Sequence, residues 1–237
     1  MMLLDCTLPT LEENLALDEA LLLEANEGNI GEVLRFWEWP SFAVVLVSGG
    51  KVADDVHLPN CEVDGVTIHR RSSGGGTVLL GRGCLLYTLI LSYDRDERLE
   101  QIHSSYQFIL GKLIQSLKSF HIVEQVGISD LAIDGRKFSG NAQQRKRNYL
   151  LHHGTILIHM DLSVISRYLL EPPRQPDYRE QRPHDEFVCN FGFDVASIKN
   201  AITESWEVEA ATIDWPEARV AKLVSEKYSL GSWIHRR

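Results

Sequence analysis

The chain has 237 residues, a formal charge of −9, and 44% hydrophobic and 24% charged residues. That length suits one large domain, and the composition is ordinary for a soluble globular protein. Nucleic-acid binding is not expected of so acidic a chain. The apolar start Met1–Leu4 soon meets Asp5, so neither a signal peptide nor a membrane span is expected. We predict a single domain over residues 1–237, located in the cytoplasm.

The first predicted helix covers Leu11–Asn26, because its leucines follow helical spacing and Gly28 provides a stop. The runs Val33–Trp39 and Phe42–Val47 are predicted to be paired strands, with Pro40-Ser41 in the turn between them. Further strands are expected at Val66–His69, Cys84–Leu91 and His153–His159, and further helices at Glu100–Phe120, Val164–Leu170, Val195–Trp206 and Glu217–Lys227.

The order of these elements favours an α+β layer fold. The clearest loop, Glu171–His184, is rich in proline and charge. We interpret it as a surface crossing that borders a site, because too little chain follows it to form an independent core.

The most informative segment is Arg70–Thr77, in which two arginines and two serines lead into three consecutive glycines. Glycine lets a backbone approach a ligand, and successive N–H groups in such a turn can surround an anion. Arginine adds an always-charged fork that suits a carboxylate or phosphate. The segment therefore predicts a binding loop for a small anion, although an ordinary glycine-rich turn flanked by surface arginines has a similar composition.

A hairpin is predicted further along, where Asp134-Gly135 separates two short apolar runs. Lys137 follows this turn among small residues, and a lysine there could reach a phosphate or carboxylate as a point charge. A lone lysine on a hairpin is more often simply solvated. The pair His152-His153 then leads into an alternating strand, where a packed histidine is at least as common as one that contacts substrate.

Together these segments resemble the lipoate–protein ligase family, within the superfamily of biotin and lipoate ligases and octanoyltransferases. The family's Arg-Arg-x-Ser-Gly-Gly-Gly loop is matched by Arg70–Gly76, and its Gly-x-Lys-x-x-Gly-x-Ala-Gln-like segment by Gly135–Gln143. Its His-His-Gly-Thr-Leu-Leu-like strand is matched by His152–Leu157, and its opening helix by Asn14–Leu21. The resemblance covers most of the chain and implies a mixed β-sheet flanked by helices.

The resemblance implies a two-step reaction with ATP, Mg²⁺ and lipoate. A lipoate carboxylate, or that of octanoate, attacks the α-phosphate of ATP to give an acyl-adenylate. The ε-amine of a lysine on a lipoyl carrier domain then attacks this mixed anhydride. Lys137 is the implied catalytic residue, because it would bridge the acyl carbonyl and the phosphate and stabilise charge in both steps.

The resemblance also implies the remaining site residues. Contacts to the nucleotide or adenylate are expected from Arg71, Gly75, Gly76, Thr77, Val78, Leu79, Asp130 and Lys137. Contacts to lipoate are expected from Arg70, Ser73, Gly74, Lys137, Gly140 and His153. Asp130 lies where the family places a polar group near the nucleotide and its Mg²⁺, so it is the expected metal contact.

The chain departs from the family pattern in two places. Leu80-Gly81 stands where many lipoate ligases have His-Asp, and Cys84 where they carry Asn. Gly81–Cys84 instead resembles the Gly-Pro-Gly-Gln of octanoyltransferases. Larger ligases also carry a C-terminal accessory domain, whereas this chain stops soon after Lys227–Trp233. If adenylation needs that domain, we expect it on a separate polypeptide.

Two alternatives are open. An octanoyl or lipoyl transferase would take its acyl group from a carrier thioester through a cysteine. Such enzymes place the cysteine in positions that here hold Val126–Ser129 or Leu150-Leu151, and Cys84 is the only cysteine near a motif. A small buried residue is the commoner role for Cys84. A non-catalytic module that holds a lipoyl group is the other alternative, and the retained Lys137 argues against it.

Overall fold

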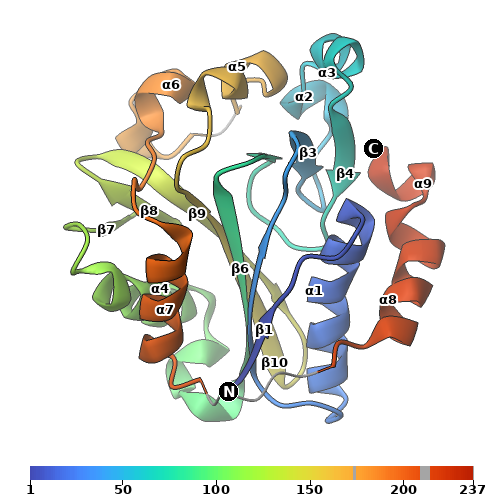
Figure 1. Ribbon diagram of the computed structural model, residues 1–237, viewed down its shortest axis with the longest axis vertical. Helices are drawn as coiled ribbons and strands as arrows, with labels where there is room; N and C mark the ends of the chain where they lie inside the picture. Colours follow the sequence, from blue (N-terminus) through green and yellow to red (C-terminus); the bar gives the residue numbers. More distant parts are fainter. Residues whose placement is uncertain (173–174, 209–213, 237) are drawn as a thin grey trace.

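The computed structural model describes residues 1–172, 175–208 and 214–236, so part of the predicted loop Glu171–His184 lies outside the described residues. The main sheet has seven strands in the order β1-β2-β6-β10-β9-β8-β7 (Figure 1). They are β1 (Met2–Asp5), β2 (Val33–Glu38), β6 (Cys84–Ser92), β7 (Glu124–Val126), β8 (Asp130–Ile133), β9 (Arg136–Arg145) and β10 (Tyr149–Leu157). Only the β1–β2 pair is parallel, which confirms the expected mixed sheet.

A second sheet has three strands in the order β4-β3-β5, formed by β3 (Ala43–Leu46), β4 (Thr67–Arg70) and β5 (Val78–Leu80). The predicted pairing of the β2 and β3 segments is therefore wrong. β2 pairs with β1 and β6, and the chain leaves the main sheet near Pro40-Ser41 before it enters the second sheet. Both strands are almost fully buried, and an apolar run shows that a segment is a strand without showing which strand it pairs with.

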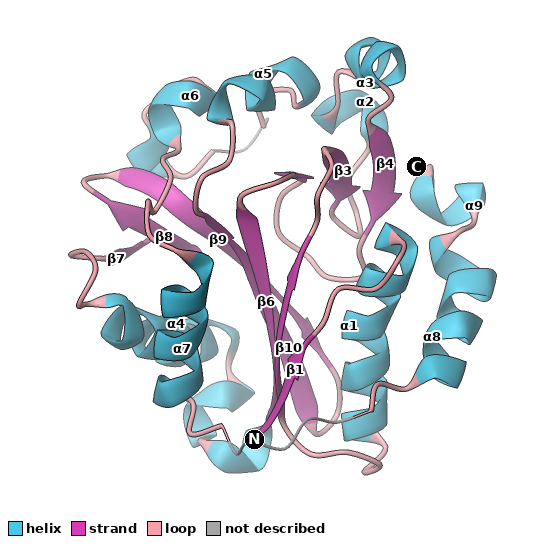
Figure 2. Cartoon of the chain, in the orientation of Figure 1, coloured by secondary structure: helices cyan, strands magenta, loops and turns pink. Residues whose placement is uncertain are grey.

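Helices cover both faces of the main sheet (Figure 2). One face carries α4 (Ile102–Leu117) and α7 (Val195–Ser205), and the other carries α1 (Leu11–Asn26), with α8 (Glu217–Leu223) and α9 (Gly231–Ile234) outside it. The short helices are α2 (Val52–Asp55), α3 (Leu58–Asp64), α5 (Ile165–Tyr168) and α6 (His184–Phe187). The remaining turns are η1 (Tyr93–Arg95), η2 (Glu97–Glu100), η3 (Leu162–Val164), η4 (Asp177–Arg179) and the π-helical η5 (Val224–Tyr228).

The helix predicted over Leu11–Asn26 is confirmed as α1. It begins with a capping box, in which Thr10 Oγ1 accepts from the amide of Glu13 and the Glu13 carboxylate accepts from the amide of Thr10. It is buried on most sides because it lies between the sheets and the segment that carries α8 and η5. The charged residues Asp18 and Glu19 are therefore buried within an apolar helix, which requires partners for both.

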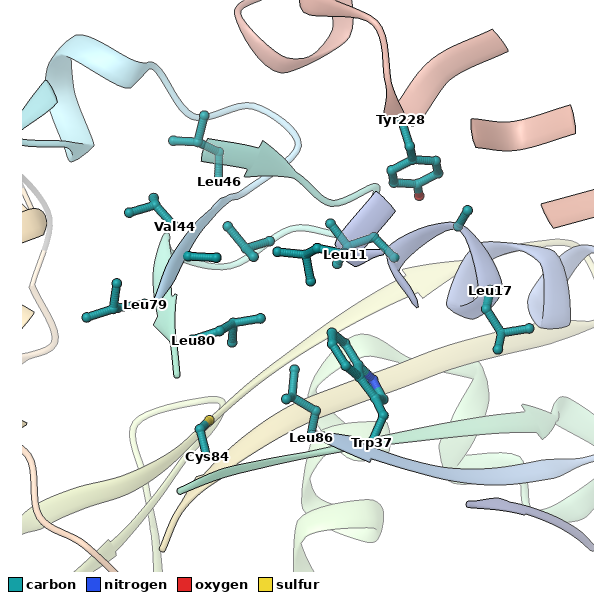
Figure 3. Packing of buried hydrophobic residues seen from close by; sticks show 14 of the residues in the cluster. Leu11, Leu17, Trp37, Val44, Leu46, Leu79, Leu80, Cys84, Leu86 and Tyr228 are labelled. Atoms are coloured by element: carbon teal, nitrogen blue, oxygen red, sulfur yellow. The ribbon is translucent and has the colours of Figure 1, made fainter. Parts of the chain in front are cut away.

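The core next to α1 positions the site. Trp37 and Leu86 of the main sheet face Leu11 of α1 and Leu80 of the second sheet (Figure 3). This packing holds the second sheet over one end of the main sheet and leaves a cavity between them. Of the helices in residues 1–172, 175–208 and 214–236, none combines the length and apolar character needed to cross a bilayer.

Candidate active site

A cavity of about 130 Å³ lies between α1, the second sheet and the main sheet. Its walls differ in chemistry. The apolar wall is formed by Leu15, Trp37, Val45, Val78, Leu80 and Leu86, and the polar wall by Asp130, Lys137, Asn141, His153 and Thr155. Such a cavity fits a ligand with an apolar chain and an anionic head.

The glycine loop, residues Ser72–Thr77, is folded around the side chain of Arg71. The guanidinium donates to the carbonyl oxygens of Gly74 at 2.6 Å and Gly76 at 2.7 Å, and its Nε donates to Ser73 Oγ at 2.9 Å. Burial lowers the pKa of Arg71 to about 10. Gly75 has φ +92°, and a Cβ there would lie 3.1 Å from Arg71 Nη2. The loop therefore needs both its arginine and a glycine at its tip.

The glycine loop is also tied down at both ends. Before it, the Arg70 guanidinium donates to the carbonyl oxygens of Val47 at 2.9 Å and Ile234 at 2.7 Å. After it, Thr77 Oγ1 donates to Asp55 Oδ2 at 2.7 Å. Arg70 thus joins the chain before α2 to the C-terminal segment, and it does not line the cavity.

His153 connects the glycine loop to a buried ion pair. Asp18 accepts from Arg35 at 2.6 Å and lies 3.1 Å from His153 Nδ1, while Ser73 Oγ lies 2.6 Å from His153 Nε2. A carboxylate can only accept, so Nδ1 carries the proton, and in the neutral ring Nε2 is left to accept from the Ser73 hydroxyl. Burial works to raise the pKa of Asp18, but the charge of Arg35 and the bond from His153 hold it below its usual value.

Lys137 and Asp130 form the charged pair of the cavity. Lys137 Nζ lies 2.8 Å from Asp130 Oδ1, and the Tyr178 hydroxyl donates to Asp130 Oδ2 at 2.8 Å. A Cβ on Gly140 would lie only 2.8 Å from Lys137 Nζ. Because Gly140 has no side chain, the side chain of Lys137 can lie over that position of β9.

Most of the predicted site residues meet in this cavity. It is lined by Arg71, Gly75, Gly76, Thr77, Val78, Asp130, Lys137, Gly140 and His153. The predicted contacts that do not line it are Arg70, Ser73, Gly74 and Leu79. Ser73 nevertheless touches two lining residues, because its hydroxyl bonds to both Arg71 and His153.

Sequence reasoning missed Asp18, Asn141 and Tyr178 as site residues. Asn141 Nδ2 donates to the carbonyl oxygen of Ser129 at 2.8 Å, which fixes the segment that carries Asp130. A charged residue in the middle of an apolar helix was a visible signal for Asp18. The position of Tyr178, which lies 48 residues after Asp130, had no comparable signal.

The four cysteines are all described, and none lines the cavity. Burial raises the pKa of Cys6, Cys61 and Cys189, and burial with the charge of Glu38 raises that of Cys84 to about 12. A nucleophilic cysteine needs the opposite shift, toward thiolate. The interpretation of Cys84 as a small buried residue fits this setting.

The described residues do not fit a Mg²⁺ site built by the protein itself. Within them, no group of three or more histidine, cysteine, aspartate or glutamate side chains is placed to hold an ion. Asp130, the expected metal contact, already pairs one carboxylate oxygen with Lys137 and the other with Tyr178.

Comparison with known proteins identifies relatives of this chain. Residues 10–214 match the lipoyl protein ligase A/B catalytic domain. An octanoyltransferase LipM from Carboxydothermus hydrogenoformans is 31% identical, and the match covers 94% of each chain. A Mycoplasma pneumoniae protein with the name "Probable lipoate-protein ligase A" is 33% identical over 66% of this chain and 45% of its own length.

The fold also matches solved structures. In the structure of a bi-partite lipoate–protein ligase and its E2 lipoyl domain from Thermoplasma acidophilum, the similar chain has a TM-score of 0.84 and 22% identity. The match covers 99% of this chain and 95% of that one. At this identity the likeness concerns the fold, and it confirms the expected architecture.

Proposed function

The chain belongs to the lipoyl protein ligase A/B catalytic domain family, and within it we propose that this protein is an ATP-dependent lipoate–protein ligase. It would activate lipoate or octanoate as an acyl-adenylate and transfer the acyl group to a lysine of a lipoyl carrier domain. The observation that carries the proposal is which residues line the cavity: Lys137 is among them, and none of the four cysteines is.

The first step joins the acid to the nucleotide. A carboxylate oxygen of the acid attacks the α-phosphorus of ATP, an O–P bond forms, and the bond to pyrophosphate breaks. The Lys137 ammonium stabilises the negative charge that develops around the phosphorus. Gly75 and Gly76 let the loop backbone approach the phosphate, while the apolar wall takes up the acyl chain.

The second step transfers the acyl group. The carrier lysine's uncharged amine attacks the acyl carbonyl carbon, a C–N bond forms, the C–O bond to AMP breaks, and the amine proton leaves to solvent. Lys137 stabilises the carbonyl oxygen and the departing phosphate. Because the described acidic residues include no group placed to hold a cation, Mg²⁺ would be held chiefly by the nucleotide phosphates.

A second candidate is octanoyl transfer from a carrier thioester. It is favoured by the 31% identity to an octanoyltransferase along nearly the whole chain. A covalent route through Cys84 is disfavoured by the raised pKa and complete burial of that thiol. In this candidate the uncharged amine of the carrier lysine would attack the thioester carbonyl carbon directly in the cavity, beside Lys137. A C–N bond would form, the C–S bond would break, and the donor would leave as a thiol that takes up the proton lost by the amine.

We expect the protein partner to be a lipoyl carrier domain; if adenylation requires an accessory domain, we expect a separate polypeptide to supply it. We expect the reaction to take place in the cytoplasm, which is supported by four cysteines that form no disulfide. We also propose that residues 1–237 act as one domain, because the cavity draws its walls from segments between Leu15 and Thr155.

Isotope exchange between pyrophosphate and ATP tests the adenylation step without a carrier. We expect exchange that depends on lipoate and MgATP and disappears in Lys137→Ala. No exchange, together with acylation of a carrier domain by an octanoyl thioester in the absence of ATP, would establish the second candidate instead. If exchange appears only after a second polypeptide is added, the adenylation proposal stands and the accessory chain is required.

A further inference from the structure

The Asp130 carboxylate is shared between two partners from distant parts of the chain. Its Oδ1 lies 2.8 Å from the Lys137 ammonium, and its Oδ2 accepts from the Tyr178 hydroxyl at 2.8 Å. Asp130 and Lys137 line the cavity, whereas Tyr178 comes from η4, outside it. The family motifs identified in the sequence do not extend to η4.

Tyr178 is held firmly where it stands. Its ring packs against Phe187 with centroids 5.1 Å apart. Arg182 donates to the carbonyl oxygens of Tyr178 at 2.8 Å and Gly135 at 3.0 Å, which joins this segment to the turn between β8 and β9. The same turn connects Asp130 to Lys137, so the hydroxyl and the charged pair belong to one connected unit.

The segment after Tyr178 is bonded to β9 as well. The amide of Cys189 donates to the carbonyl oxygen of Lys137 at 2.9 Å, and Arg136 Nη2 donates to the carbonyl oxygen of Val188 at 2.7 Å. The first contact is made to Lys137 itself and the second by its neighbour Arg136. The backbone of the lysine and its carboxylate partner are thus fixed by the same stretch of chain.

From this arrangement we propose that Tyr178 is a positioning residue for Lys137 and acts through Asp130. With Oδ2 bonded to the hydroxyl, Asp130 offers a single oxygen to the ammonium. An ammonium has three N–H donors, so Lys137 can turn the other two toward a ligand in the cavity. Without the hydroxyl, both carboxylate oxygens compete with the ligand for the lysine.

The phenol suits this role because it remains a donor. Burial and the neighbouring Asp130 carboxylate raise the pKa of Tyr178 well above its ordinary value. The inference rests on the proposed function, because it takes an acyl-adenylate as the ligand of Lys137.

A double-mutant cycle tests the proposal, with lipoyl-AMP as the probe and no carrier present. Its affinity is measured by calorimetry for the parent, Tyr178→Phe, Lys137→Ala and the double variant. We expect Tyr178→Phe to weaken binding roughly 10-fold, as for a lost hydrogen bond to a charged group. We expect Lys137→Ala to weaken it further, and the double variant to match Lys137→Ala.

Tyr93→Phe is the matched control, because it deletes a hydroxyl that bonds to the carbonyl oxygen of Lys146 outside the cavity. It should bind like the parent. Parent-like binding by Tyr178→Phe, or losses that simply add in the double variant, would overturn the positioning role and leave the ligase proposal intact. A parent protein that does not bind lipoyl-AMP would overturn both.

Discussion

The hydroxyl oxygen of Ser73 lies 2.6 Å from Nε2 of His153, which bonds the glycine loop directly to the main sheet. His153 is held in turn by Asp18, whose charge is matched by Arg35. A buried ion pair in the core thus fixes the orientation of a ring at the cavity, and the ring fixes the loop. The loop is preorganised for a ligand by bonds that reach into α1 and β2.

Substitutions at the two glycines on either side of Gly75 can distinguish an effect on ligand binding from an effect on folding. Neither Gly74 nor Gly76 has a positive φ or any atom within 4 Å of an added Cβ, but only Gly76 lines the cavity. We expect Gly76→Val to keep a melting temperature near that of the parent while losing the stabilisation given by MgATP plus lipoate. Thermal-shift titration measures this, with Gly74→Val as the control. A ligand-induced shift in Gly76→Val as large as the parent's would mean that the loop is only a turn.

Lys137 should be required for both half-reactions. Its ammonium is the group on the cavity wall that we assign to the developing negative charge. Lys137→Ala should fold, and should lose about 10²- to 10³-fold or more in the rates of adenylate formation and of acyl transfer, comparable to removal of an oxyanion donor. Lys146→Ala, at the residue that follows the last residue of β9, is the control. Carrier modification near the parent rate in Lys137→Ala would remove this lysine from the mechanism.

Cys84 should be dispensable for the chemistry. Its thiol is buried at the start of β6, and burial with the charge of Glu38 raises its pKa to about 12. Cys84→Ser should keep substantial activity, with any loss arising from a hydroxyl placed in an apolar site. Rates of carrier acylation and the intact mass of the enzyme after incubation with acyl donor measure this. A hydroxylamine-labile acyl adduct on Cys84 would establish the thioester route.

His152 should make the protein less stable in acid. Burial, with a smaller effect of the neighbouring His153, lowers the pKa of His152 from 6.5 to about 3. Between these values the unfolded chain binds a proton that the folded chain does not, so stability falls as pH falls. The slope for this one group is about 1.4 kcal/mol per pH unit. His69 and His184, whose pKa values are also lowered by burial, add to it.

Urea unfolding of His152→Gln between pH 6.5 and 4 measures that contribution. We expect the variant to show a shallower dependence of unfolding free energy on pH than the parent. His103→Gln, at an exposed position, is the matched control for the substitution itself. An unchanged slope in His152→Gln would show that this histidine does not contribute to acid sensitivity.

Local signals in the sequence predicted local structure well. The Asp134-Gly135 turn is confirmed, because both residues have positive φ, at 50° and 71°. The predicted helix Glu100–Phe120 corresponds to α4. The predicted helix Glu217–Lys227 splits into α8 and the π-helical η5, a change of hydrogen bonding that apolar spacing does not reveal.

Relations between distant segments could not be read in the same way. Nothing local in Arg70 indicates that its guanidinium bonds to the carbonyl oxygen of Ile234, 164 residues away. The bond between Tyr178 and Asp130 likewise depends on how η4 crosses the hairpin. Residue type identified Lys137 as a candidate. Its contact with Asp130 passes close to Gly140 and depends on the β-bulge that shifts the register between β8 and β9, which residue type does not reveal.

The most direct test of the account is the mass of an apo lipoyl carrier domain incubated with this protein. One reaction contains lipoate and MgATP, and the parallel reaction contains an octanoyl-carrier thioester and no ATP. The proposed ligase predicts addition of a lipoyl group in the first reaction, and loss of that product in Lys137→Ala. Octanoylation in the second reaction, with an unmodified carrier in the first even after an accessory polypeptide is added, would contradict it.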